Sequence, residues 1–107
     1  MRAFNIVMQL GTQYGPEKTN IPTVDIDYWL VTELPNVLHQ FNGGYFSRHA
    51  TATVINKGYQ ECVMVISFIM PDTTDMIDVV HRIREMYCKH FQQESVVTVI
   101  TECEALL

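Results

Sequence analysis

Apolar and polar residues alternate over several stretches of the chain, and this alternation is typical of β-strands that bury one face. In the first stretch the apolar residues lie two positions apart, with Asn5 and Gln9 between them. Two later stretches are rich in β-branched and aromatic residues, and the short glycine-containing connection between them predicts a β-hairpin. We expect strands over residues 3–10, 45–55, 59–70 and 95–101.

In two other stretches the apolar residues recur at intervals of three and four, which predicts helices with one buried face. The first covers 25–41 and contains Pro35, whose ring opposes the carbonyl four residues earlier, so we expect a kink or a restart there. The second covers 76–91, and either Asp72 or Thr73 before it is a suitable N-cap residue.

The elements follow one another as strand, helix, two strands, helix and strand, which is the ferredoxin-like order. This α+β fold is a four-stranded antiparallel sheet with both helices on one face. The 107 residues suit a single domain over 1–107. With 48% apolar and 18% charged residues, the composition excludes a disordered chain.

The second face of this sheet has no helix to cover it. On the third strand Cys62 and Met64 share the core side, so Val63 and Val65 face outward. A surface this apolar is unusual for a solvated sheet, and we therefore expect a homo-oligomer in which sheets pack together. The fourth strand adds to this face either Val97 and Val99 or Val96 and Ile100.

The charge balance argues against nucleic acid as a partner. Seven Lys and Arg residues stand against twelve Asp and Glu residues, a net charge of −5, whereas phosphate backbones are bound by clustered basic residues. An RNA-recognition module of the same element order would also need stacking aromatic residues where Val63 and Val65 lie. An acidic protein is better matched to a cationic or neutral small ligand.

Other patterns limit the location and the chemistry. No run of about 20 apolar residues would span a membrane, and Met1–Ala3 leads directly into the first strand, so we expect a cytoplasmic protein. The three cysteines are widely spaced, which favours buried, reduced thiols. The four histidines are dispersed and have no metal-ligand spacing, so we expect no metal site.

The candidates for a binding site are Glu61, Tyr59, Gln93 and Glu94. Glu61 lies near the start of the third strand, two positions from Tyr59 and on the face opposite the core. It is either a solvated carboxylate or one that faces a cleft between subunits and binds an ammonium or sulfonium group. Gln93 and Glu94, between the second helix and the fourth strand, are either turn residues or part of the same site. Placing them near Glu61 requires a rim arrangement or a neighbouring subunit.

Three segments resemble a known family: Gly43–Tyr45, Glu61–Val65 and Phe91–Val96. They are similar to the small phage-encoded enzymes that degrade S-adenosylmethionine (SAM), formerly called SAM hydrolases and now understood as SAM lyases. The resemblance covers residues 43–101 and implies a ferredoxin-like trimer with active sites between subunits. In it the key carboxylate falls on Glu61.

The same resemblance implies further site residues. The family's Gln–Glu pair, which binds substrate, falls on Gln93 and Glu94. The family's hairpin tyrosine has no direct counterpart, because Ala50 or Thr51 stands at that point. Tyr45 and Tyr59 are the substitutes that the chain offers for the catalytic hydroxyl.

The implied reaction uses neither a metal nor a cofactor. The carboxylate of the methionine moiety displaces the sulfonium group of SAM, and the products are homoserine lactone and 5′-methylthioadenosine. Holding the reacting groups in this geometry is a source of up to ~7–11 kcal/mol of barrier reduction. The alternative from another class is a non-enzymatic ferredoxin-like module that binds a small ligand or inhibits a host protein.

Overall fold

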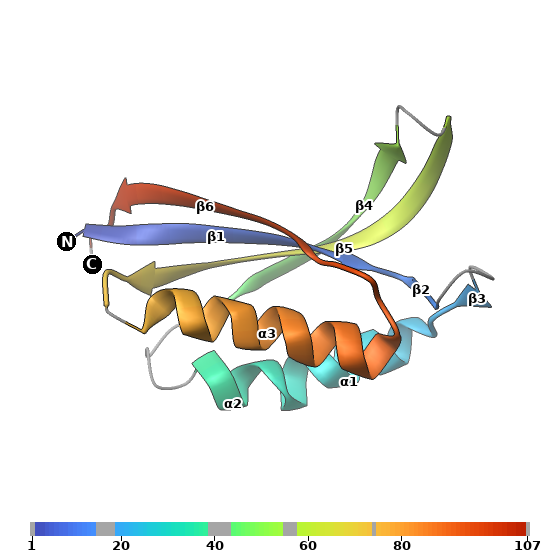
Figure 1. Ribbon diagram of the computed structural model, residues 1–107, viewed down its shortest axis with the longest axis horizontal. Coiled ribbons are helices and arrows are strands. Elements are labelled where there is room, and N and C mark those ends of the chain that lie inside the picture. Colours follow the sequence, from blue (N-terminus) through green and yellow to red (C-terminus); the bar gives the residue numbers. More distant parts are fainter. Residues whose placement is uncertain (1, 15–18, 39–43, 55–57, 74, 107) are drawn as a thin grey trace.

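Figure 1 shows a computed structural model of the chain, which describes residues 2–14, 19–38, 44–54, 58–73 and 75–106. A four-stranded sheet and one layer of helices make up most of the described fold. The sheet contains β1 (Arg2–Gly11), β4 (Phe46–Val54), β5 (Tyr59–Pro71) and β6 (Val97–Glu104). The helices are α1 (Thr23–Thr32), α2 (Leu34–Leu38) and α3 (Met76–Phe91). A small hairpin of β2 (Gln13–Tyr14) and β3 (Thr19–Asn20) lies between β1 and α1.

The four strands of the sheet run in the order β4-β5-β1-β6, and every neighbouring pair is antiparallel. The helices lie together on one face of this sheet (Figure 1). This arrangement confirms the predicted α+β class and the antiparallel sheet. Among the described residues, no helix is long and apolar enough to cross a membrane.

The first helical segment is broken where Pro35 predicts it. Helix α1 ends at Thr32, and α2 starts at Leu34 after Glu33, whose backbone N–H donates to the Trp29 carbonyl at 2.9 Å. Proline lacks an N–H group and its ring crowds the preceding turn, so the chain restarts instead of continuing one regular helix.

The start of α3 differs from the sequence prediction. Its N-cap residue is Asp75, so the assignment of Asp72 or Thr73 as the cap was wrong. The hydroxyl of Thr73 donates to the Asp75 carboxylate at 2.8 Å, and the Met76 N–H donates to the Thr73 carbonyl at 3.3 Å. The polar residues before the helix therefore form a turn that precedes it, while Asp72 forms an ion pair with Arg2 at 3.4 Å.

Aromatic side chains join the helices to one end of the sheet. Trp29 of α1 packs edge to face on Tyr87 of α3 with ring centroids 5.1 Å apart, and Tyr87 lies 4.8 Å from Phe91. The buried Tyr87 hydroxyl donates to the carbonyl of Gly11 at 2.5 Å, and burial raises the pKa of this hydroxyl well above its usual value. The aromatic cluster therefore fixes the end of β1 against α3.

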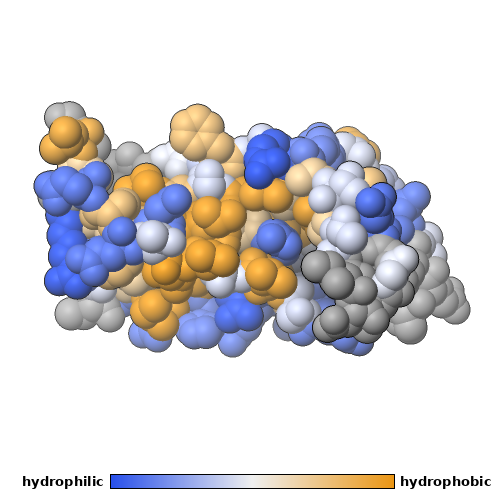
Figure 2. All heavy atoms as spheres, turned by 90° about the horizontal axis from the view of Figure 1, so that it is seen from above, coloured by the Kyte–Doolittle hydropathy of each residue, from blue (hydrophilic) through white to orange (hydrophobic). Residues whose placement is uncertain are grey.

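The face of the sheet away from the helices carries a band of apolar side chains (Figure 2). Val63 and Val65 lie on this side of β5, as predicted, because Met64 and Ile66 occupy the helix side, but Val63 is buried and Val65 half-buried. Pairing with Val7 and Gln9 of β1 puts Val99 and Val97 on the same face, where they are 53% and 56% exposed. Figure 2 shows the resulting band of hydrophobic side chains across this surface, which we call the open face.

The β4–β5 hairpin extends past the rest of the sheet. Pairing of β1 with β5 ends at Gly11 and Val63, whereas β4 and β5 stay paired as far as Val54 and Tyr59. The hairpin curves away from the other strands (Figure 1). Cys62 lies in this extension and is exposed.

The exposure of Cys62 contradicts the expectation of buried thiols. Cys62 is exposed because neither β1 nor a helix covers the strand at that point. The other two cysteines, Cys88 and Cys103, are half-buried, and all three are free thiols. Burial raises the pKa of the Cys88 thiol.

Candidate functional site

Glu61 lies at the base of the projecting hairpin. Its backbone pairs with Ala52 of β4, and its place in the alternation of β5 puts it on the open face, two residues before Val63. The side chain is half-buried. Within the described ranges its carboxylate forms no hydrogen bond or ion pair.

The chain leaves the sheet beside Glu61 through Thr12. The Thr12 hydroxyl donates to the backbone carbonyl of Cys62 at 2.6 Å, one residue from Glu61. The backbone carbonyl of Thr12 accepts from the Ile21 N–H at 2.8 Å. Thr12 was not among the predicted site residues, and its one signal in the sequence is its position directly after Gly11.

Gln93 reaches this same segment from the end of α3. Helix α3 ends in a left-handed residue, Gln92 (φ 52°, ψ 48°), and the Gln93 N–H donates back to the Cys88 carbonyl at 2.9 Å. The Gln93 side-chain Nε2 donates to the carbonyls of Gln13 at 2.7 Å and Phe91 at 2.8 Å. The structure therefore places Gln93, within one chain, against the segment that leaves the sheet beside Glu61.

Gly11 leaves room for the Gln93 side chain. A Cβ atom built on Gly11 would lie 2.1 Å from Gln93 Oε1, far inside contact distance. Gly11 pairs with Val63, so this missing Cβ points to the open face. A side chain at this position would therefore meet the end of the Gln93 side chain, which would have to shift.

Glu94 and Tyr59 are neighbours of these residues along the chain. Glu94 is exposed beside Gln93. The backbone of Tyr59 pairs with Val54 at the start of β5, two residues before Glu61.

Tyr45 lies elsewhere in the fold. Its hydroxyl donates to the Leu30 carbonyl at 3.0 Å in the helix layer, and burial, with a further contribution from Asp27, raises its pKa. The adjacent Phe46 pairs with Ser67, six residues from Glu61 along β5 or about 20 Å. Within one chain the structure does not bring Tyr45 to Glu61.

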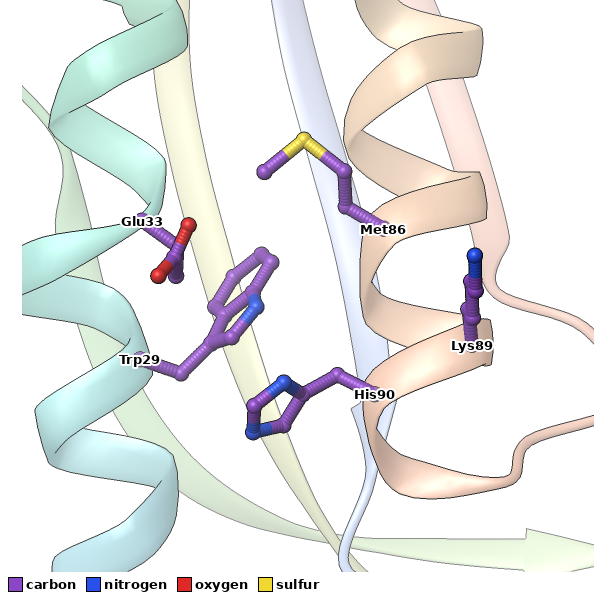
Figure 3. A pocket seen from close by; sticks show the side chains of 5 residues that line it. All are labelled: Trp29, Glu33, Met86, Lys89 and His90. Carbon is purple, nitrogen blue, oxygen red and sulfur yellow. The ribbon is translucent and has the colours of Figure 1, made fainter.

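A groove of about 400 Å³ lies between α1 and α3 on the opposite side of the molecule. Figure 3 shows the side chains of Met86 and His90 extending from α3 toward Trp29, with Glu33 beside Trp29, while Lys89 runs along α3. None of the predicted site residues lines this groove. The periodicity of the two helices does not show that these residues line a groove.

Comparisons with known proteins bear on the fold. No protein-family model matches the chain, and no curated protein matches it. A solved structure of a phage SAM lyase in complex with S-methyl-5′-thioadenosine matches 94% of this chain and 81% of its own, with a TM-score of 0.56 and 17% identity. A phage SAM lyase in the apo state matches 92% and 79%, with a TM-score of 0.52 and 16% identity. The chain thus has the fold that the sequence resemblance implied.

Proposed function

We propose that this protein is a SAM lyase that converts SAM into 5′-methylthioadenosine and homoserine lactone. The observation that carries the proposal is the fold shared with a phage SAM lyase whose structure holds methylthioadenosine, over 94% of this chain. The half-buried carboxylate of Glu61, which has no partner in the described part of the chain, supports it. A sulfonium substrate with an α-ammonium group is a ligand of the charge that this site requires.

The reaction is an intramolecular displacement. A carboxylate oxygen of the methionine moiety forms a bond to its own γ-carbon, the bond between that carbon and sulfur breaks, and the electron pair remains on sulfur. No proton is transferred and no water is consumed. Glu61 binds the α-ammonium group and holds the substrate in the folded conformer from which the carboxylate attacks, so its contribution is orientation.

We place the site at a contact between copies of the chain, in a homotrimer formed through the open face. Val97 and Val99 supply exposed apolar area for such a contact. Of the two tyrosines, Tyr59 is our choice for the catalytic hydroxyl because it lies in the same strand as Glu61, whereas the Tyr45 hydroxyl already donates to Leu30. Glu94 is our choice for a second substrate contact.

The test is to incubate the purified protein with SAM and to separate the products by chromatography. We expect methylthioadenosine and homoserine lactone in equal amounts from the wild type. Glu61→Gln keeps the shape of the side chain and removes its charge, and we expect a loss of roughly 2–3 kcal/mol, which is a 30- to 150-fold fall in turnover.

Glu85→Gln is the matched control, because Glu85 is an exposed carboxylate on α3 in the helix layer. It should turn over SAM at the wild-type rate. Equal activity of Glu61→Gln and the wild type would show that the carboxylate is in the wrong place. Absence of any turnover by the wild type would favour the non-enzymatic module.

A further inference from the structure

The strand that carries Glu61 is supported unequally on its two sides. Toward β4, Glu61 pairs with Ala52 in the regular ladder. Toward β1 the ladder has already ended at Gly11 and Val63. In the part of the chain that the structure describes, the contact that continues on this side is the 2.6 Å hydrogen bond from the Thr12 hydroxyl to the Cys62 carbonyl.

The segment that presents this hydroxyl is held at three successive carbonyls. Gly11 accepts from the Tyr87 hydroxyl of α3 at 2.5 Å. Thr12 accepts from the Ile21 N–H at 2.8 Å. Gln13 accepts from Gln93 Nε2 at 2.7 Å. A loop whose consecutive carbonyls are each bonded to a different part of the chain has little freedom, so the Thr12 hydroxyl is presented at a defined position.

The bonds of Gln93 show what its side chain does. Both hydrogens of the amide group are used, one toward Gln13 and one toward Phe91. The remaining polar atom, Oε1, lies over Gly11. Gln93 therefore has no donor left for a substrate, and its effect on the site passes through the loop that it holds.

We propose that Thr12 is a positioning residue for Glu61, and that Gln93 acts on the reaction by holding Thr12 in place. This inference rests on the proposed function. An orienting carboxylate must be held to within about 0.5 Å of its productive position, and the Thr12 hydroxyl anchors the adjacent peptide where the β1 ladder no longer does. Without this bond the backbone at Glu61 is held from the β4 side only, within the described part of the chain, and we expect the carboxylate to shift from the ammonium group of the substrate.

The experiment compares Thr12→Val with Thr12→Ser. Valine keeps the shape and loses the hydroxyl, and we expect kcat/KM for SAM to fall about ten-fold, as the loss of one hydrogen bond of roughly 1.4 kcal/mol predicts. Serine keeps the hydroxyl and should restore most of the activity. Binding of methylthioadenosine, which lacks the amino-acid moiety, should be unchanged in both variants.

Thr98→Val is the matched control. The Thr98 hydroxyl also donates to a backbone carbonyl, that of Val96 at 3.1 Å, but on β6. We expect a similar small loss of stability and wild-type turnover. Wild-type turnover by Thr12→Val, or a loss that serine does not restore, would overturn the positioning role of Thr12. Weakened methylthioadenosine binding would overturn it as well, since the damage would then extend beyond Glu61. A wild-type protein that binds methylthioadenosine but leaves SAM intact would refute the proposed lyase instead.

Discussion

Replacement of Gly11 by alanine tests the contact between the end of β1 and Gln93. The added Cβ would lie 2.1 Å from Gln93 Oε1, so the amide must move. It then loses its hydrogen bonds to Gln13 and Phe91. Each bond is worth about 0.5–1.5 kcal/mol. Because Gln93 is half-buried and water replaces part of this loss, we expect Gly11→Ala to cost about 1–2 kcal/mol.

The same substitution should have the opposite effect once the amide is absent. Gly58, and not Gly11, is the glycine with a positive φ in the described residues, so an alanine at position 11 meets no backbone strain. Gly→Ala at a compatible position stabilises by about 0.4–1 kcal/mol through the unfolded state. In a Gln93→Ala background we therefore expect Gly11→Ala to be stabilising. The double-mutant cycle should give a coupling energy of about 2 kcal/mol.

Urea unfolding followed by tryptophan fluorescence measures these differences. Trp29 is the single tryptophan of the chain and is 2% exposed, packed on Tyr87 in the cluster that adjoins Gly11. All four proteins must be compared at the same concentration, because self-association makes the midpoint depend on concentration. Costs of Gly11→Ala that agree within about 0.5 kcal/mol in the two backgrounds would refute the predicted contact.

Three further predictions concern association, mechanism and pH. Replacing Val97 and Val99, which are exposed on the open face, by lysine should lower the mass measured by light scattering. Lysine at Val24, which is 70% exposed on α1, should leave the mass unchanged. Equal masses for the two variants would exclude the open face as the contact. In oxygen-18 water, early quenching should give unlabelled lactone, because the substrate's own carboxylate attacks; labelled homoserine without a lactone precursor would mean that water attacks directly. Because burial raises the pKa of Tyr87 in the folded protein, its neutral hydroxyl contributes fully to stability below the pKa of an unfolded tyrosine, about 10. This contribution is lost as the pH rises above that value. Urea unfolding of Tyr87→Phe should therefore show less loss of stability than the wild type above pH 10, and parallel curves would contradict this.

The strands and helices could be predicted from the sequence because periodicity records which side of an element is buried. Alternation at Val63 and Met64 assigned the two faces of β5 correctly, and Pro35 located the break between α1 and α2. These signals are local: each depends on residues a few positions apart. The same alternation predicted that Glu61 lies on the open face.

What local patterns left open was decided by the ends and the register of the strands. Residues 96–100 are all apolar except Thr98, so the sequence did not show which side of β6 faces the helices. Pairing with β1 decided this by putting Val99 opposite Val7. Alternation placed Cys62 on the core side, but it is exposed because β1 stops at Gly11.

The candidate site shows the same division between sequence and tertiary structure. The sequence itself supplied Glu61, a carboxylate on the open face. The approach of Gln93 to that end of the sheet depends on how α3 packs, through Tyr87, against the carbonyl of Gly11. The role of Thr12 depends on a hydrogen bond to Cys62, fifty residues away in the chain. Contacts of this kind join elements that are distant in sequence, and their distances are set by packing, which no periodicity records.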